Sequence, residues 1–372
     1  ERSGFTDMNL TEMPVFRLTS DCIWNSFQSS NKRHLVLTGA AKSGKSTLLS
    51  QLFPDPLPGI TTWADPGKAV YLRENSTGKS AQIGIYDDSL PGVRNKMRLC
   101  PEGFRTLGIM SLQRFTETES EWISIDEIGY LEMECWDYCN EIRKLMNRKR
   151  LVAAVRKQDL SFLEELCHLD DVFLVDLDSP FGSIGCVIMA SGLGTRFGGN
   201  KLMTPFKGKP LIQWVLDATE EIFSRRVVVT RHEAVKELCR GQGIEVVYHN
   251  LSGLNDTIRL GLHTVAQDVE GCMFCPGDQP MLGRDTIAAL GLNAVNDKER
   301  IWRAAWGDEA GSPVLFPKGM FPELLALPEG KGGSYVIKKH PDQVGKVLAR
   351  DKYELMDIDS PKDLELLSGG IL

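Results

Sequence analysis

The chain of 372 residues is 42% hydrophobic and 25% charged, and its formal net charge is −7. This length favours two or three domains, and this composition lets each domain bury a sizeable hydrophobic core. Because nonspecific nucleic-acid binding needs a dominant basic face, the acidic balance argues against a nucleic-acid partner, and any phosphate has to be bound locally by loops.

Neither the apolar runs nor the cysteines indicate export or a membrane. No apolar run approaches the roughly 18 residues that a membrane span needs, and no signal-peptide pattern opens the chain. The nine cysteines show no dense spacing, which favours reduced thiols. Cys272 and Cys275 resemble half of a redox or zinc site, but in a strand they would point to opposite faces, so we expect both to be structural. We therefore expect a cytoplasmic protein without a membrane partner.

Short β-branched runs alternate with amphipathic stretches along the chain. In the first half, the runs that predict buried strands are residues 34–39, 121–126, 150–155 and 172–177. The helices predicted between them follow Lys45 or lie at 133–148 and 159–167.

The second half repeats this alternation without repeating the sequence. Its predicted strands are residues 185–191, 225–230, 244–249 and 271–277. Its predicted helices lie near 210–222, 232–240 and 255–267. Apolar strands separated by helices favour a parallel sheet covered on both faces, here twice. Since a turn-rich segment at 176–185 separates the halves, we expect an α/β protein with two domains, residues 14–182 and 183–372.

A glycine-rich loop follows the first predicted strand. Residues 39–47 read GAAKSGKST and fit the pattern G-x-x-x-x-G-K-[ST] between a strand and a helix. In such a loop the glycines let backbone N–H groups surround phosphates, the lysine reaches the β- and γ-phosphates, and the next hydroxyl binds Mg²⁺. The predicted nucleotide-binding residues are Gly39, Gly44, Lys45, Ser46 and Thr47. Ser46 is also a predicted metal ligand.

Two adjacent carboxylates lie at the end of the strand predicted at 121–126: Asp126 is its last residue, and Glu127 follows it. Asp126 is predicted to hold Mg²⁺ through a water molecule, and Glu127 stands where a catalytic, water-activating carboxylate is needed. The alternative is that these carboxylates cap the next helix. The sequence has no N-K-x-D-type element for guanine, so it does not identify the base of this nucleotide.

Together, the P-loop, the stretch IDEIGYLE at 125–132 and the VAAV strand resemble the thermostable nucleoside-triphosphatase family, which is related to nucleotide kinases. The resemblance covers residues 33–178 and implies that the first half binds and hydrolyses NTP. A different interpretation stays open. The first half could be a slow nucleotide switch or a metallochaperone module that docks a client and hydrolyses only when bound.

A second glycine-rich loop, of a different design, lies at 189–202 and reads MASGLGTRFGGNKL. Gly192 and Gly194 turn the chain after a strand, and Arg196 and Lys201 follow as two separate cations. Such a pair can stabilise the α-phosphorus and the departing pyrophosphate, where charge builds up in nucleotidyl transfer. The loop therefore predicts catalytic roles for Arg196 and Lys201.

The second half, residues 185–368, resembles the nucleotidyltransferases that attach CMP or GMP to the molybdenum pterin cofactor, within the glycosyltransferase-A-like superfamily. The other motifs that carry this resemblance are CPGDQPML at 275–282, GSPVLFP at 311–317 and MDIDSPKDL at 356–364. The resemblance implies that Asp278 is a Mg²⁺ ligand and that Asp357 or Asp359 lies near the same metal. The residues that it places at the nucleotide are Ala190, Ser191, Gly192 and Gly194.

Ser191 stands where the guanylyl branch of this family usually has glycine, which favours the cytidylyl branch and CTP. An acceptor that is a phosphate monoester is already anionic and needs alignment and charge neutralisation rather than a general base. We therefore expect His249 and His263 to be structural. Two departures from the family pattern lie near the expected acceptor, at 255–256 and at 330–337.

The sequence thus predicts a bifunctional protein of molybdenum cofactor biosynthesis. Its C-terminal half is expected to transfer CMP from CTP to a molybdopterin-type cofactor, and its N-terminal half to hydrolyse NTP. The expected partners are NTP, the molybdopterin-type cofactor and a molybdoenzyme client, with Mg²⁺ as cofactor. Alternatives for the second half are GMP transfer, or a CDP-alcohol or sugar-nucleotide product, which would require a base near Asp278.

Overall fold

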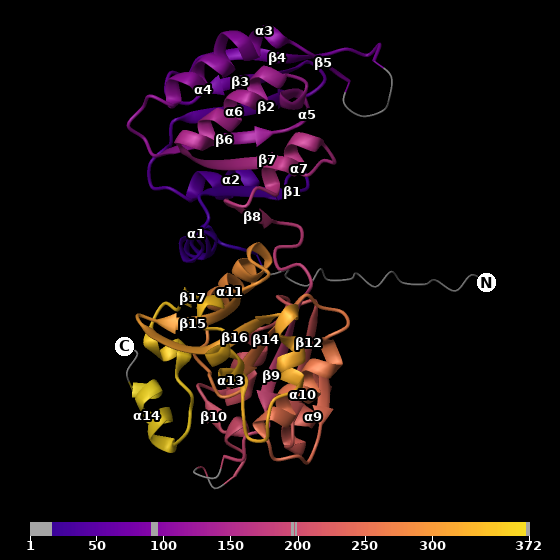
Figure 1. Cartoon of the computed structure of the whole chain (residues 1–372), viewed down its shortest axis with the longest axis vertical. Coiled ribbons are helices and arrows are strands. Elements are labelled where there is room, and N and C mark those ends of the chain that lie inside the picture. Colours follow the sequence, from indigo (N-terminus) through magenta and orange to yellow (C-terminus); the bar gives the residue numbers. More distant parts are fainter. Residues whose placement is uncertain (1–16, 91–95, 195–196, 198, 370–372) are drawn as a thin grey trace, which may run out of the picture.

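The structure is a computed structural model that describes residues 17–90, 96–194, 197 and 199–369. In these residues the chain forms two α/β domains, one above the other in Figure 1, each built on its own β-sheet. The predicted fold class, α/β with two domains, is therefore confirmed. The predicted boundary near residue 182 lies between the last strand of the first sheet and the first strand of the second.

The first sheet has the strand order β5-β4-β3-β2-β6-β7-β1-β8. Its strands are β1 (His34–Gly39), β2 (Gly59–Asp65), β3 (Ala69–Glu74), β4 (Ser80–Tyr86), β5 (Met97–Leu99), β6 (Trp122–Ile128), β7 (Arg150–Arg156) and β8 (Val172–Asp176). Strands β2, β6, β7, β1 and β8 run parallel to one another. Strands β3, β4 and β5 extend the sheet in antiparallel order. The expectation of a wholly parallel sheet is therefore wrong at this end, where the sequence analysis predicted no strand.

Helices follow most of the parallel strands of this domain. They are α2 (Lys45–Gln51), α3 (Pro101–Gly103), the π-helical turn Phe104–Ile109, α4 (Met110–Phe115), α5 (Tyr130–Met133), α6 (Trp136–Arg148) and α7 (Ser161–Cys167). The three helices predicted from the sequence correspond to α2, α6 and α7. No helix among the residues that the structure describes combines the length and the apolar character needed to cross a membrane.

The second sheet has the order β13-β12-β9-β14-β16-β15-β17, and a short β10-β11 hairpin lies beside it. Its strands and the hairpin are β9 (Ile184–Ala190), β10 (Pro205–Phe206), β11 (Lys209–Pro210), β12 (Arg225–Thr230), β13 (Glu245–Tyr248), β14 (Gly271–Pro276), β15 (Ile301–Trp306), β16 (Glu309–Pro317) and β17 (Val344–Leu348). Strand β16 is antiparallel to both of its neighbours, so this sheet is also mixed rather than wholly parallel. The helices are α8 (Leu211–Ala218), α9 (Glu233–Gly241), α10 (Leu254–Val265), α11 (Arg284–Asn296), α12 (Phe321–Leu325), α13 (Gly333–Lys339) and α14 (Pro361–Gly369).

The central strands of both sheets are buried on both faces, which explains their continuous apolar sequences. In β14, Cys272 belongs to the hydrophobic cluster on one face, whereas Cys275 belongs to the cluster on the other face and lies 3.7 Å from the thiol of Cys186. The predicted opposite orientation of Cys272 and Cys275 is confirmed. Both are buried free thiols, so their role is packing.

Helix α1 (Ser20–Ser29) lies between the two domains and packs against α11 and β17 (Figure 1). The Asn293 side chain on α11 donates a hydrogen bond to the Ser26 carbonyl (3.1 Å). The amide of Asn296, one turn further along α11, binds the backbone of Leu174 in β8, accepting from its N–H (2.6 Å) and donating to its carbonyl (2.9 Å). Because β8 is the edge strand of the first sheet, α11 covers an edge that would otherwise expose unpaired backbone groups.

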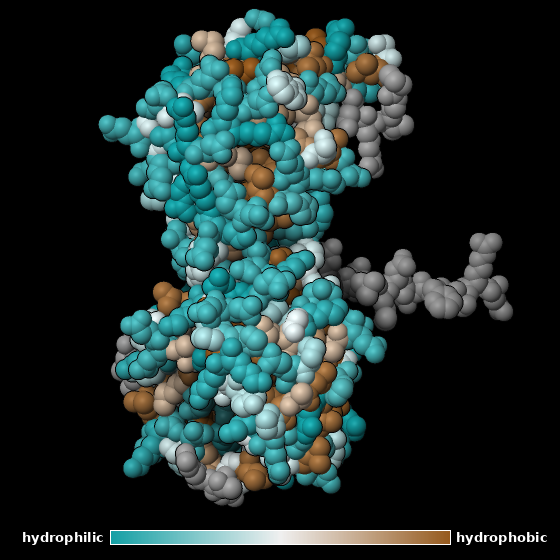
Figure 2. Space-filling view, viewed as in Figure 1, coloured by the Kyte–Doolittle hydropathy of each residue, from teal (hydrophilic) through white to brown (hydrophobic). Residues whose placement is uncertain are grey.

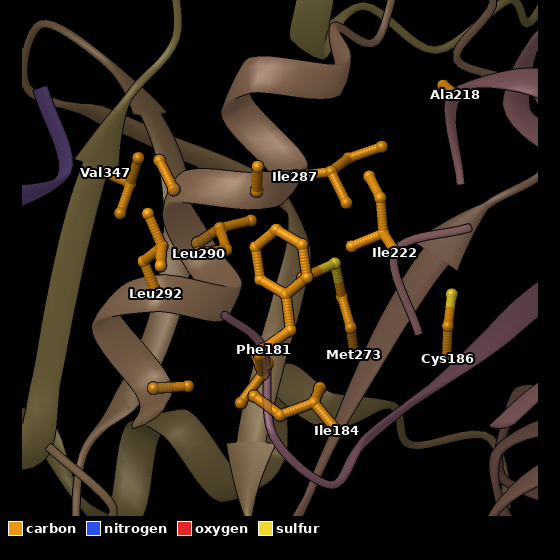
Figure 3. Packing of buried hydrophobic residues seen from close by; sticks show 14 of the residues in the cluster. Phe181, Ile184, Cys186, Ala218, Ile222, Met273, Ile287, Leu290, Leu292 and Val347 are labelled. Atoms are coloured by element: carbon orange, nitrogen blue, oxygen red, sulfur yellow. The ribbon is translucent and has the colours of Figure 1, made fainter. Parts of the chain in front are cut away.

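The segment that connects the domains is anchored in the second domain. Phe181 is buried beneath α11 beside Ile184, Met273 and Ile287 (Figure 3). This hydrophobic cluster continues through α1 into the first sheet, where it includes Leu35 in β1. Figure 2 shows the domains joined at a narrower waist, on a face that is largely hydrophilic. A continuous core therefore connects the two domains.

Candidate functional site

The P-loop lies at the carboxyl end of β1, where α2 begins. Gly39 and Gly44 have φ values of 147° and 95°, which side chains rarely adopt, so glycine is required at both positions. The Lys45 ammonium donates to the carbonyls of Gly39 and Ala40, both at 2.8 Å. A cavity of about 550 Å³ opens above the loop. Its lining includes every residue predicted for nucleotide binding in this half, Gly39, Gly44, Lys45, Ser46 and Thr47.

Ser46 and Asp126, predicted metal ligands from distant parts of the sequence, meet in the lining of a neighbouring cavity, and Ser46 also lines the P-loop cavity. The Ser46 hydroxyl donates to Asp126 Oδ1 at 2.7 Å. Burial raises the pKa of Asp126, a sign that this carboxylate is short of positive charge. A hydroxyl and a carboxylate oxygen are ligands that Mg²⁺ prefers, so the residues present fit this metal.

Glu127, the predicted catalytic carboxylate, sits at a β-bulge between Asp126 and Ile128. Its backbone φ is +80°, which is uncommon for a residue other than glycine and costs conformational energy. Its side chain forms a close ion pair with Arg156 at the end of β7 and lines the P-loop cavity. A strained carboxylate that faces the cavity above a P-loop is typical of a functional site rather than of a helix cap.

Arg156, Lys157 and Asp178 also belong to this site, and the sequence analysis did not identify them. Arg156 and Lys157 line the P-loop cavity, and both oxygens of Asp178 accept the N–H of Ala40. Arg156 is the last residue of β7, Lys157 follows it, and Asp178 comes two residues after the end of β8. Because the carboxyl ends of neighbouring parallel strands meet at one edge of a sheet, that position was a usable signal.

The second glycine-rich loop lies at the carboxyl end of β9. Ala190 ends this strand, and Gly194 has a φ of 58°. A Cβ at Gly194 would lie 2.5 Å from the Gly199 carbonyl, so the turn that leads to Lys201 requires glycine here. Arg196, the other predicted catalytic cation, lies outside the described residues.

Lys201 is the centre of a charged cluster built from three segments. Its buried ammonium contacts Asp278 Oδ2 at 2.6 Å, Asp359 Oδ1 at 3.0 Å and the Ile358 carbonyl at 2.8 Å. Burial alone would lower the pKa of Lys201, but Asp278 and Asp359 outweigh it and raise the pKa above its ordinary value. The structure therefore brings the predicted cation and two predicted metal ligands together, and it keeps the cation charged.

Asp357 lies beside this cluster. Burial and the neighbouring Asp278 raise the pKa of Asp357 to about 6, although Gln279 donates a hydrogen bond to it at 3.0 Å. The Asp357 carboxylate is an oxygen donor in need of a cation, and Asp278 is less exposed than Asp359, so Asp278 and Asp357 are the pair that fits Mg²⁺.

Among the described residues, no group of three or more His, Cys, Asp or Glu side chains could hold a metal ion. Mg²⁺ is commonly bound by one or two carboxylates together with substrate phosphates and water. In each domain the predicted ligands would therefore supply part of a coordination shell, and a bound nucleotide would supply much of the rest.

Ser191 is held by a histidine that the sequence analysis expected to be structural. His249 Nδ1 accepts the N–H of Leu251 at 3.1 Å, so Nε2 carries the proton and donates to the Ser191 hydroxyl at 2.8 Å. That hydroxyl in turn donates to the Val229 carbonyl at 3.1 Å. Burial lowers the pKa of His249, which keeps the ring neutral. His249 thus fixes the orientation of a residue in the nucleotide loop.

The two departures from the family pattern meet in space. Asn255 is buried at the start of α10, and its Oδ1 accepts the N–H of Gly330 at 3.0 Å. Asp256 accepts the N–H of Gly253 at 3.1 Å and so caps the same helix. The loop that begins at residue 330 is therefore fixed to the start of α10 by Asn255.

Comparison with known proteins identifies both halves. The family model described as a MobA-like NTP transferase domain matches residues 186–344, and the model described as NTPase matches residues 73–180, after the P-loop. A 3-deoxy-manno-octulosonate cytidylyltransferase of Bdellovibrio bacteriovorus is 33% identical over 30% of this chain and 45% of its own length. A probable molybdenum cofactor guanylyltransferase of Natranaerobius thermophilus is 28% identical over 31% of this chain and 57% of its own.

The chain spans about half the length of these relatives. Among solved structures, a nucleotidyl transferase from Methanothermobacter thermautotroptrophicus is 20% identical in sequence. The superposition includes 50% of this chain and 96% of that protein, with a TM-score of 0.43. The two matched ranges follow one another along the sequence and fall on the two sheets. The chain therefore carries an NTPase domain followed by a MobA-like NTP transferase domain.

Proposed function

We propose that the C-terminal domain transfers CMP from CTP to the terminal phosphate of a molybdopterin-type cofactor and releases pyrophosphate, while the N-terminal domain binds and hydrolyses NTP. The observation that carries the first activity is the buried ammonium of Lys201 between Asp278 and Asp359, at the end of the glycine-rich loop. A positive charge fixed there is available to the phosphates of a nucleotide that the loop would bind.

The roles of the residues follow from their charges. Mg²⁺, held by Asp278 and Asp357 and by the nucleotide, would neutralise charge on the phosphates. Lys201 would stabilise the charge that develops on the α-phosphoryl group and the departing pyrophosphate. The ion pairs with Asp278 and Asp359 hold the ammonium in place before substrate arrives, so little reorganisation is needed during the reaction.

A phosphate monoester is the acceptor that needs least from the groups described around the loop. Such an acceptor is already anionic, so alignment and charge neutralisation are enough for attack on the α-phosphorus. Two histidines contact the described part of the loop. His249 uses both ring nitrogens to hold Ser191 and Leu251, and His232 Nε2 donates to the Gly192 carbonyl at 2.7 Å. A sugar-hydroxyl acceptor would instead require a free base near Asp278.

The choice of CTP over GTP rests on Ser191. Its hydroxyl proton is directed to the Val229 carbonyl, which leaves a lone pair of the oxygen as an acceptor. The exocyclic amino group of cytosine is a donor that can pair with it, whereas guanine presents a carbonyl at the corresponding position. GMP transfer is the second candidate, because a relative of this chain is named a molybdenum cofactor guanylyltransferase.

In the N-terminal domain, the nucleotide phosphates would take the place of the Gly39 and Ala40 carbonyls as partners of Lys45. Mg²⁺ would be held by Ser46 and Asp126, and Glu127 would orient the attacking water. The alternative role of this domain, as a nucleotide switch or metallochaperone module for a molybdoenzyme client, predicts tight nucleotide binding with near-zero basal hydrolysis. Turnover measured without a client distinguishes the two.

The first experiment is a pyrophosphate-release assay with the full chain, Mg²⁺, purified molybdopterin-type cofactor and CTP, GTP, ATP or UTP in turn. Cofactor-dependent release with CTP is the expected result. Release with GTP alone would replace CMP transfer by GMP transfer. No release with any of the four nucleotides would contradict the proposed transfer reaction, and hydroxyl acceptors would then be tested.

A further inference from the structure

A second cavity, of about 590 Å³, adjoins the P-loop cavity in the first domain. It is formed largely by the antiparallel strands β2 to β5 and by α5, the part of the fold that the sequence analysis did not predict. Its lining includes Thr62 and Ala64 from β2, Val70 from β3, Tyr86 from β4 and Glu132 from α5. The proposed NTP hydrolysis assigns no role to this cavity.

The two cavities share one wall, which is the ion pair of Glu127 and Arg156. Burial lowers the pKa of Lys45. Glu127 is close enough to Lys45 for its negative charge to offset part of this decrease. The Glu127 carboxylate therefore lies between the lysine that would hold the terminal phosphates and the second cavity. A molecule in the second cavity would face the end of a nucleotide at which a γ-phosphate is transferred.

The lining of the second cavity contains aromatic, aliphatic and polar side chains. Tyr86 and Tyr130 contribute aromatic rings, and Val70 and Leu131 contribute apolar surface. At its buried side, Glu132 accepts the N–H of Gly129 at 2.9 Å through one oxygen, while its other oxygen lies 3.5 Å from the Thr62 hydroxyl.

Burial raises the pKa of Glu132 to about 7. Near neutral pH this carboxyl group is therefore partly protonated, and it can both donate and accept a hydrogen bond. A flat ring with a hydrogen-bonding edge fits such a lining, and the volume lies within the range of small-molecule sites. Water alone would require neither the aromatic rings nor a cavity of this size.

We propose that the N-terminal domain is also a phosphotransferase, and that its acceptor, a nucleoside-like alcohol, binds in this second cavity with its hydroxyl group toward Glu127. The proposal rests on the proposed binding of NTP at the P-loop. The acceptor oxygen forms a bond to the γ-phosphorus, and the bond from that phosphorus to the β–γ bridging oxygen breaks. The hydroxyl proton goes to the Glu127 carboxylate, and the nucleoside diphosphate leaves.

The test uses the full chain, Mg²⁺ and ATP labelled at the γ-phosphate, with adenosine, guanosine, cytidine or uridine as the acceptor in turn. The labelled products are separated by chromatography. The expected result is a labelled nucleoside monophosphate with at least one of the four nucleosides, formed faster than inorganic phosphate. Labelled inorganic phosphate as the only product with all four overturns the proposal, while it leaves the proposed NTP hydrolysis standing.

A variant that fills the second cavity locates the acceptor. Ala64 is exposed at the cavity wall, so Ala64→Phe adds a ring to the cavity without disturbing the core. We expect it to lower kcat/KM for transfer at least about tenfold, since the ring excludes the acceptor, and to leave hydrolysis within about twofold of wild type. The matched control is Ile85→Phe, exposed on β4 and directed to the opposite face from Tyr86, which should change neither rate. Equal loss of transfer and hydrolysis in Ala64→Phe would assign this cavity to the NTP itself and overturn the proposal.

Discussion

The carboxylate of Asp178 accepts the backbone N–H of Ala40 through both of its oxygens, at 3.1 and 2.9 Å. This hydrogen bond, together with Lys157, holds the pKa of Asp178 below its usual range. Asp178 belongs to the segment that leads into the second domain, and Phe181, three residues further on, is buried beneath α11 (Figure 3). The segment that joins the domains is therefore bonded to the P-loop at one end and packed into the transferase core at the other.

We expect Asp178→Ala to lower the free energy of unfolding by about 1 kcal/mol, because a hydrogen bond to a charged acceptor is lost at a partly exposed site. Urea unfolding followed by circular dichroism measures the change. Asp178→Asn, which keeps one acceptor oxygen, should lose less. Equal losses in both variants would show that the Ala40 contact contributes little to stability.

Asp278→Ala should abolish nucleotidyl transfer, since it removes both a predicted metal ligand and the closest partner of Lys201. Removing one preorganised charge of this kind typically lowers the rate by about 10²–10³. Pyrophosphate release measures the effect, and NTP hydrolysis by the same variant is the control. Transfer near the wild-type rate would contradict the placement of Asp278 at the metal.

Lys45→Ala should have the opposite effect and stop NTP hydrolysis while transfer continues. The ammonium of Lys45 is the charge that the P-loop directs toward the phosphates, and a loss of about 10²–10³ in rate is expected. Phosphate release measures hydrolysis, and pyrophosphate release from the same sample measures transfer. A reduction of less than tenfold would mean that the lysine does not contact the phosphates.

Ser191→Gly should shift nucleotide preference from CTP toward GTP. The change removes the acceptor oxygen that His249 and Val229 orient. An unpaired amino group on cytosine would lower kcat/KM for CTP about tenfold. His249→Ala, which frees the serine hydroxyl without removing it, should have a smaller effect. If both variants keep the wild-type ratio of kcat/KM values, the base does not contact Ser191.

His34 makes stability depend on pH. Its ring is buried in β1, where Nδ1 accepts the Leu151 N–H at 3.0 Å and Nε2 faces Asp171 at 3.3 Å. Burial lowers the pKa of His34 from an ordinary value of 6.5 to about 4, against the opposing charge of Asp171. Between these pH values the unfolded chain binds more protons than the folded chain. Stability is therefore lost as the pH falls from 6.5 toward 4.

The comparison of wild type with His34→Asn isolates this effect, because asparagine offers an acceptor oxygen to Leu151 and does not titrate. On going from pH 7 to pH 5, wild type should lose about 1–2 kcal/mol more of its free energy of unfolding than the variant. Urea unfolding at the two pH values provides the measurement. Equal losses would contradict a neutral, buried His34.

The two glycine-rich motifs were readable from the sequence, because the residues that define each motif are close together along the chain. The P-loop at 39–47 and the glycine-rich loop at 189–202 each follow an apolar strand, and the backbone of a strand–turn–helix largely determines what such a loop can bind. Four buried strands in each half were predicted for the same reason, because continuous apolar runs fit the interior of a parallel sheet.

The strands β2 to β5 were missed because their signal is weak. Strand β4 carries exposed residues at both ends and Gly84 in its interior, and β5 is only three residues long. Their stability comes from pairing with one another and with β6 rather than from their own apolar pattern. The second cavity is formed largely by these strands, so it could not be predicted from the sequence.

The sequence by itself determined that this protein has two α/β halves, each with a glycine-rich loop of its own design, because local backbone geometry and hydrophobic periodicity are encoded by adjacent residues. Only the tertiary structure decided which distant side chains meet. It brought Lys201 to Asp278 and Asp359, His249 to Ser191, and Asp178 to the P-loop. These contacts depend on the order in which strands pair within a sheet, and pairing is a property of the whole fold rather than of any short segment.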